Sequence, residues 1–354
     1  MPDSALAPKL AAPQHKPRPL PLFLEMLRSE TAAEPARMAR ALEGLRKYQE
    51  AQRAAPRPSM PPVAERLGAS LRDYGGRGMP VVFVPSLINP PSILDLEGKS
   101  LLRWLAGRDV RPLLVDWGWD VGARSGLSVA DHVTGILLPL LDALDEAPAL
   151  VGYCLGGTMA FAAASLRPVK GVAAIAAPWH FAGFPDEARA RLAGLWDFAG
   201  PASARLGLLP MEMLQSAFWA LDPARTVRKF EDFAAMDPAS EEARRFVILE
   251  DWANDGPPLA AAAARELFEA LFRDDAPGRG EWRVGGRAVE PATLACPVLD
   301  IVSTSDRIVP AASAAGAGER LAIASGHVGM VIGGRAEQAL WAPLAAWLSR
   351  TAAK

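Results

Sequence analysis

The chain has 354 residues, half of them hydrophobic, and a formal net charge of −2, so it can bury a large core and offers no general attraction to nucleic acid. Its two cysteines do not make a disulfide framework, and four histidines without clustered carboxylates do not make a dense metal site: His15, His132, His180 and His327. These features predict a reducing, cytoplasmic compartment and argue against a structural metal and a nucleic-acid partner.

The N-terminal segment is expected to contribute little chemistry. Residues 1–19 are rich in proline and lysine and predict a flexible arm, and no apolar stretch in the chain is long enough for a transmembrane segment. Residues 20–60 predict an N-terminal helical extension, because Leu24, Leu27 and Leu42 recur at helical spacing before "AAPRPSMPP" breaks the pattern.

From Met79 onward, short apolar runs alternate with helical patterns. The runs of strand length are "PVVFVP" (80–85), "PLLVDWG" (112–118), "ALVGYC" (149–154), "GVAAIAAP" (171–178) and "CPVLDIVSTSD" (296–306). Continuous apolar strands separated by helices indicate an α/β fold with a mostly parallel central sheet, buried on both faces. We expect residues 61–178 and 278–354 to form the two parts of this core.

Residues 179–277 interrupt the alternation with aromatic-rich helical segments such as "MEMLQSAFWALD". An insertion of this length before the last core strands predicts a helical cap over a site.

The stretch Gly152-Tyr153-Cys154-Leu155-Gly156 has the spacing of the nucleophile elbow of α/β-hydrolases, with cysteine in place of the usual serine. The glycines leave room for a sharp turn from strand into helix. The N–H of Leu155, at the start of that helix, is expected to face an oxyanion and to favour the thiolate of Cys154. The alternative is a buried cysteine in a glycine-rich turn.

Asp306 and His327 complete the nucleophile–acid–histidine order of α/β-hydrolases. Asp306 stands at the end of the run 296–306 and His327 follows a further short strand, which makes a catalytic triad the main interpretation. Alone, Asp306 fits a turn cap equally well, and a single histidine is often structural. No chemistry is assigned to His15 in the arm, to His132 in the helix that starts at Ser128, to His180 at the start of the cap, or to Cys296, which is expected to be a small buried residue.

Several motifs together resemble polyhydroxyalkanoate synthases, most closely the short class III catalytic subunits, from about residue 60 to the C-terminus. The motifs are "VPSLINPPSILDL" (84–96), "LVDWG" (114–118), "GYCLGG" (152–157), "LEDW" (249–252), "SDRIVP" (305–310) and "SGHVGM" (325–330). The resemblance implies an α/β-hydrolase core that polymerises (R)-3-hydroxyacyl-CoA thioesters, with coenzyme A as part of the substrate and no separate cofactor or metal.

Carried over by position, the resemblance implies that Cys154 is the nucleophile and His327 the general base. Asp306 would orient the histidine or help to activate the hydroxyl of the growing chain. The second oxyanion N–H would come from Leu87 or Ile88. The family also implies a helical partner subunit and a place at the surface of polyester granules, and leaves a homodimer open.

Three positions depart from the family pattern. Arg307 replaces the usual histidine after the triad aspartate, "DWGWD" lacks the usual proline, and Ser86 replaces a common proline. Arg307 is expected to keep Asp306 ionised and to alter its role. Two further functions therefore stay open: a thioesterase or ester hydrolase with the same triad, and a non-catalytic, granule-associated relative.

Overall fold

The computed structural model describes residues 16–55 and 57–353, so His15 and most of the expected N-terminal arm lie outside the described residues. The chain divides into two compact units. Of the described residues, unit 1 takes in 16–55 and Leu214–Asp255, and unit 2 takes in Arg57–Met213 and 256–353.

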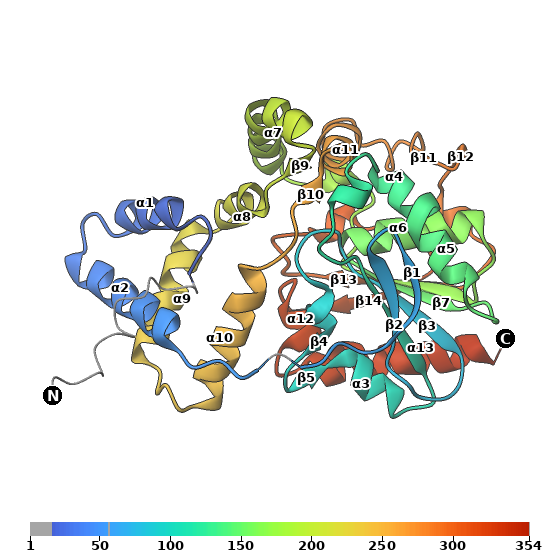
Figure 1. The fold of residues 1–354 in the computed structure, drawn as a ribbon, viewed down its shortest axis with the longest axis horizontal. Helices are drawn as coiled ribbons and strands as arrows, with labels where there is room; N and C mark the ends of the chain where they lie inside the picture. Colours follow the sequence, from blue (N-terminus) through green and yellow to red (C-terminus); the bar gives the residue numbers. More distant parts are fainter. Residues whose placement is uncertain (1–15, 56, 354) are drawn as a thin grey trace, which may run out of the picture. The chain divides into compact units, whose positions relative to one another are not determined.

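Unit 2 is built on an 8-stranded sheet with the strand order β1-β2-β6-β3-β7-β8-β13-β14 (Figure 1). These strands are β1 (Pro62–Arg66), β2 (Ala69–Asp73), β3 (Pro80–Val84), β6 (Arg111–Asp116), β7 (Ala149–Tyr153), β8 (Gly171–Ile175), β13 (Val298–Ser303) and β14 (Glu319–Ile323). The six neighbouring strands β6, β3, β7, β8, β13 and β14 pair in parallel. Every residue of β3, β7 and β8 is buried. The predicted mostly parallel α/β sheet is confirmed.

The antiparallel hairpin of β1 and β2 at one edge of the sheet has no counterpart among the predicted strands. Its turn is made by Leu67 and Gly68, with φ of 48° and 76°. A leucine rarely adopts a positive φ, and the Asn-Gly or Asp-Gly signal typical of such turns is missing. Local sequence therefore carries no indication of this hairpin.

The helices of unit 2 are α3 (Leu101–Ala106), α4 (Val129–His132), α5 (Leu138–Asp142), α6 (Leu155–Leu166), α7 (Asp186–Leu206), α11 (Ala261–Glu266), α12 (Gly329–Ile332) and α13 (Ala342–Ala352). In Figure 1, α3 and α13 lie on one side of the sheet and α5 and α6 on the other. The helix predicted to start at Ser128 is capped there, because the side chains of Ser128 and Asp131 form a reciprocal capping box.

Short strand pairs complete unit 2. They are β4 (Asp95–Leu96) with β5 (Lys99–Ser100), β9 (Leu208–Leu209) with β10 (Leu259–Ala260), and β11 (Arg283–Val284) with β12 (Arg287–Ala288).

Unit 1 is helical and consists of α1 (Leu20–Glu30), α2 (Pro35–Glu50), the end of α8 (Met211–Trp219), α9 (Pro223–Ala235) and α10 (Glu241–Ala253). Its core is aromatic: Phe23, Tyr48, Trp219, Phe230 and Phe233 are all buried together. Gly44 allows α2 to approach α9 closely, because a Cβ at this position would lie 1.9 Å from the carbonyl oxygen of Phe230.

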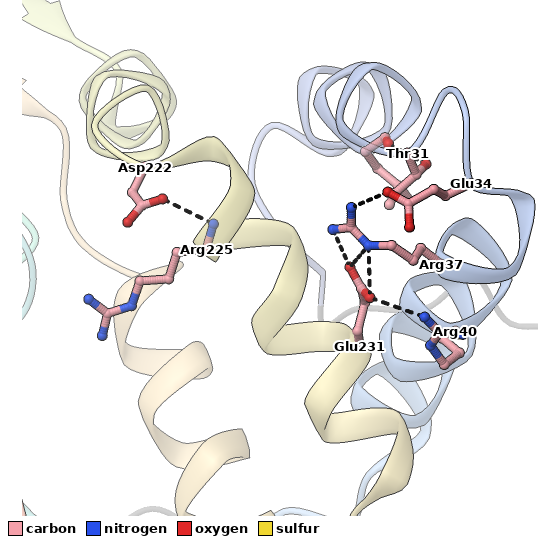
Figure 2. A network of polar contacts seen from close by, with 8 residues as sticks. Thr31, Glu34, Arg37, Arg40, Asp222, Arg225 and Glu231 are labelled. Carbon is pink, nitrogen blue, oxygen red and sulfur yellow. Dashed lines mark hydrogen bonds and ion pairs between the residues drawn. The ribbon is translucent and has the colours of Figure 1, made fainter.

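Ion pairs reinforce the contact between α2 and α9, as Figure 2 shows. Arg37 donates to both carboxylate oxygens of Glu231 and also to Glu34, and Arg40 lies 3.7 Å from Glu231. The Glu231 side chain is only 10% exposed, so water screens its pairing with Arg37 less than it would at an open surface.

This division differs from the expected one, in which residues 179–277 form a single cap. The middle of that insertion, Leu214–Asp255, packs with the N-terminal helices. The reason is that the aromatic side chains of α9 and α10 find their apolar partners on α1 and α2. Among the described residues, no helix is both long and apolar enough to cross a membrane.

Candidate active site

Cys154 occupies the sharp turn between β7 and α6, with φ of 56° and ψ of −132°. A residue other than glycine is strained in this conformation, and such strain is typical of functional positions. The turn depends on its glycines: a Cβ on Gly152 would lie 2.3 Å from Gly157 Cα, and one on Gly156 would lie 2.0 Å from Val84 O. The backbone therefore has the geometry expected of a nucleophile elbow.

A backbone hydrogen-bond donor lies next to Cys154 at the start of α6. The cysteine is partly exposed, and its own N–H donates to Ile175 O at 2.9 Å. Leu155 is the first residue of α6, so its N–H has no acceptor within the helix and lies at the positive end of the helix dipole. An oxyanion formed at Cys154 would find a donor here.

His327 and Asp306 are brought together by the structure. His327 Nδ1 lies 2.6 Å from Asp306 Oδ2, and the two side chains are 7% and 0% exposed. The other oxygen of Asp306, Oδ1, accepts from the backbone N–H groups of Ile308 at 2.7 Å and Val309 at 3.1 Å. The loop after β13 thus holds the carboxylate with one oxygen directed at the histidine.

Cys154 is the remaining partner of His327. Burial alone would lower the pKa of His327, but the charge of Cys154 and hydrogen bonds to Asp306 and Cys154 raise this pKa to about 10. Since Nδ1 is engaged by Asp306, Nε2 is the nitrogen left for the cysteine. A pair of imidazolium and thiolate can form between these side chains.

Two side chains that sequence reasoning missed hold the loop that carries His327. Ser303 donates to the carbonyl oxygen of Ser325 and accepts from the N–H of Ser305, at 3.1 Å. Tyr153 stacks on the imidazole of His327, with ring centroids 4.9 Å apart and planes 26° apart, and its hydroxyl donates to His327 O at 3.3 Å. Tyr153 is next to Cys154, but its contact with a residue 174 positions later has no signal in the sequence.

The loop after β3 carries the predicted oxyanion residues. Ser86 and Leu87 are buried, and the N–H of Ile88 donates to Ser86 Oγ at 3.1 Å. Trp117 Nε1 donates to Pro85 O at 3.1 Å and fixes the start of the loop. Because the N–H of Ile88 is already engaged, Leu87 is the stronger of the two candidates.

Arg307 is exposed, whereas the hydrogen bonds described for Asp306 go to Ile308, Val309 and His327. The carboxylate is thus held by the loop and the histidine, and the role expected for Arg307 stays a prediction.

His132, His180 and Cys296 lie in structural settings. His132 is buried, its Nδ1 lies 2.7 Å from Ser128 O, and burial lowers its pKa to about 4. The N–H of His180 donates to Ser313 O at 2.9 Å. Cys296 is half-buried rather than fully buried, and burial raises the pKa of its thiol.

A cavity of about 360 Å³ lies behind the histidine loop, lined by residues that include Ser325, Met330 and Arg335 but neither Cys154 nor Asp306. In the part of the chain that the structure describes, no three histidine, cysteine, aspartate or glutamate residues are grouped to hold a metal ion.

Comparisons with known proteins agree with the fold of unit 2. A family model described as "alpha/beta hydrolase fold" matches residues 125–328. The chain is 27% identical over 295 residues to "Poly(3-hydroxyalkanoate) polymerase subunit PhaC" of Thiocystis violacea, covering 76% of this chain and 80% of the relative. It is 29% identical to the protein of the same name from Synechocystis sp., covering 77% and 78%.

Among solved structures, a hydrolase from Pseudomonas aeruginosa PA01 superposes with a TM-score of 0.51 at 17% identity, covering 79% of this chain and 94% of that one. A likeness at this level of identity concerns the fold alone.

Proposed function

The chain belongs to the α/β-hydrolase fold family, and we propose that it acts there as a polyhydroxyalkanoate synthase, an acyltransferase that polymerises (R)-3-hydroxyacyl groups from CoA thioesters. One observation carries the proposal: the elbow nucleophile is a cysteine, next to a buried histidine and aspartate, in a chain whose relatives are named poly(3-hydroxyalkanoate) polymerase subunits.

Acylation begins when His327 takes the proton of Cys154 and the thiolate attacks the carbonyl carbon of the acyl-CoA. The N–H groups of Leu155 and Leu87 stabilise the resulting oxyanion. As the tetrahedral intermediate collapses, the bond to the CoA sulfur breaks and His327 returns the proton to that sulfur. CoA leaves, and the acyl group remains on Cys154 as a thioester.

Elongation uses the same groups in the same order. A 3-hydroxyl attacks the thioester on Cys154 while His327 accepts its proton, and Asp306 stabilises the imidazolium that forms. An ester bond forms, the bond to Cys154 Sγ breaks, and the cysteine is free for the next acyl group.

A cysteine suits this chemistry better than a serine. Exchange of one thioester for another costs almost no free energy, so the acyl group on Cys154 stays reactive until an alcohol arrives. A serine ester would be a weaker acyl donor to that alcohol.

We further propose that the protein works at the surface of its polyester granule in the cytoplasm and that a helical partner subunit supports it, as the named relatives are subunits. A homodimer is a further arrangement that a mass measurement in solution would test.

The deciding experiment incubates purified protein with (R)-3-hydroxybutyryl-CoA and follows both CoA release and product. Polymer with CoA release supports the synthase. Free 3-hydroxybutyrate with CoA release would instead indicate a thioesterase or ester hydrolase. No CoA release and no acylation of Cys154, with or without a candidate partner, would indicate a non-catalytic relative. Cys154→Ala is the control for each reaction.

A further inference from the structure

We infer that Tyr153 is a positioning residue that sets the orientation of the His327 imidazole toward Cys154. The inference rests on the proposed roles of Cys154 and His327, and it assigns a function to the residue immediately before the nucleophile.

The contacts of Tyr153 with His327 are of two kinds. Its ring lies against the imidazole, with centroids 4.9 Å apart and planes 26° apart. Its hydroxyl donates to the carbonyl oxygen of the same histidine, at 3.3 Å. One side chain therefore holds both the ring and the backbone of His327.

The imidazole needs this second support. The bond from Nδ1 to Asp306 holds one edge of the ring but tolerates some rotation of the ring plane about the Cβ–Cγ bond. A flat surface against the ring restricts this rotation and keeps Nε2 directed at Cys154. Tyr153 is 4% exposed and ends β7, so its ring is itself held in place by the sheet.

The same arrangement couples the nucleophile to its base. Tyr153 and Cys154 are consecutive, so the strand that presents the thiol also presents the support of the histidine. The titratable groups that face His327 are Asp306, Cys154 and Tyr153, and burial, with the charges of Cys154 and Asp306, raises the pKa of Tyr153 well above its ordinary value. The tyrosine hydroxyl thus stays neutral and acts as a hydrogen-bond donor.

The test is the pH dependence of Cys154 alkylation by iodoacetamide, measured in a Cys296→Ala background with the labelled peptide identified by mass spectrometry. Tyr153→Phe keeps the ring and loses the hydroxyl, whereas Tyr153→Leu loses both. Phe161→Leu is the matched control, because Phe161 is a fully buried aromatic residue that contacts Trp179.

For Tyr153→Leu we expect the rate of labelling at pH 7 to fall by about tenfold or more, because the imidazole of His327 is no longer held where it can take the proton of the Cys154 thiol. Tyr153→Phe should change the pH profile by much less, and Phe161→Leu should leave it unchanged. Turnover of 3-hydroxybutyryl-CoA by Tyr153→Leu should fall in kcat more than it rises in KM.

A wild-type labelling profile in folded Tyr153→Leu would overturn the inference, as would an equal change in Phe161→Leu. Alkylation does not depend on the natural substrate. If the chain fails to polymerise but the labelling profiles behave as expected, the proposed function is wrong and the role of Tyr153 stands.

Discussion

The carboxylate of Asp306 and the imidazole of His327 are joined at 2.6 Å in a site where the aspartate side chain has no solvent exposure. Since two backbone N–H groups hold the other carboxylate oxygen, the aspartate cannot turn away from the histidine without losing those bonds. This rigidity favours a role for Asp306 in orienting His327 and stabilising its charged form.

Replacement of the nucleophile should separate activity from stability. Cys154→Ala is expected to abolish CoA release from 3-hydroxybutyryl-CoA while the protein stays folded. Cys154→Gly should also be inactive but more stable than Cys154→Ala, by about 1 kcal/mol, because glycine adopts the positive φ of 56° without strain. Chemical denaturation of the two variants measures this difference. Retention of more than a few per cent of activity in either would mean that another residue carries the acyl group.

Removal of the general base in His327→Gln should slow turnover about 10²–10⁴-fold, the usual range for a positioned acid–base group. His327→Gln should also reduce the alkylation of Cys154 at neutral pH, since an imidazolium no longer supports the thiolate. Rates from CoA release and from iodoacetamide labelling check both effects. Unchanged labelling together with unchanged turnover would remove His327 from the site.

The raised pKa of His327 predicts how stability depends on pH. Its value in the folded protein is about 10, against an ordinary value of 6.5, so the folded state binds the proton more tightly than the unfolded chain. The resulting stabilisation is complete below about pH 6.5 and is lost as the pH rises through about 10.

The difference in unfolding free energy between wild type and His327→Gln should therefore shrink over this pH range. Cys154→Ala removes the charge that raises this pKa most and should weaken the dependence. Denaturant titrations at a series of pH values provide the measurement. A difference that grows with pH would show that the histidine is neutral in the folded protein.

Ser86 offers a test of the oxyanion loop. If Leu87 supplies the second N–H and Ser86 holds the turn through Ile88, Ser86→Ala should lower kcat several-fold with little change in KM. Ser86→Thr keeps the hydroxyl and should retain most of the activity. If Ser86→Ala increases kcat, the released N–H of Ile88 is the better donor and the assignment to Leu87 is wrong.

Gly44 provides a test of unit 1. Gly44→Ala places a Cβ 1.9 Å from Phe230 O, so α2 must move away from α9, and we expect destabilisation by about 1–3 kcal/mol. Gly194→Ala is the matched control, because Gly194 also lies in a helix but has no atom within 4 Å of the added Cβ. This control should stabilise the protein by about 0.5–1 kcal/mol. Thermal unfolding followed by circular dichroism compares the two, and equal effects would contradict the close packing of α2 on α9.

The amino-acid sequence alone determined the strands and turns that depend on residues close together in the chain. The apolar runs that form β3, β6, β7, β8 and β13 are predictable, because strands buried on both faces must be continuously apolar. The turn at Cys154 is also predictable, since its flanking glycines are required by the close approach of the backbone to Val84 and Gly157. The order of Cys154, Asp306 and His327 then indicates which strand ends face one site.

Tertiary structure alone decided the contacts between distant segments. Tyr153 meets His327 across 174 positions, and a tyrosine before the nucleophile fits a buried strand whether or not it touches a histidine. The sequence pattern predicts one cap, yet Leu214–Asp255 packs with the N-terminal helices, because an apolar helix face does not specify which other face will cover it. The hydrophobic effect favours the burial of an apolar helix face but does not specify which other surface covers it. The fit between the folded segments decides this, as the close contact of Gly44 with Phe230 illustrates.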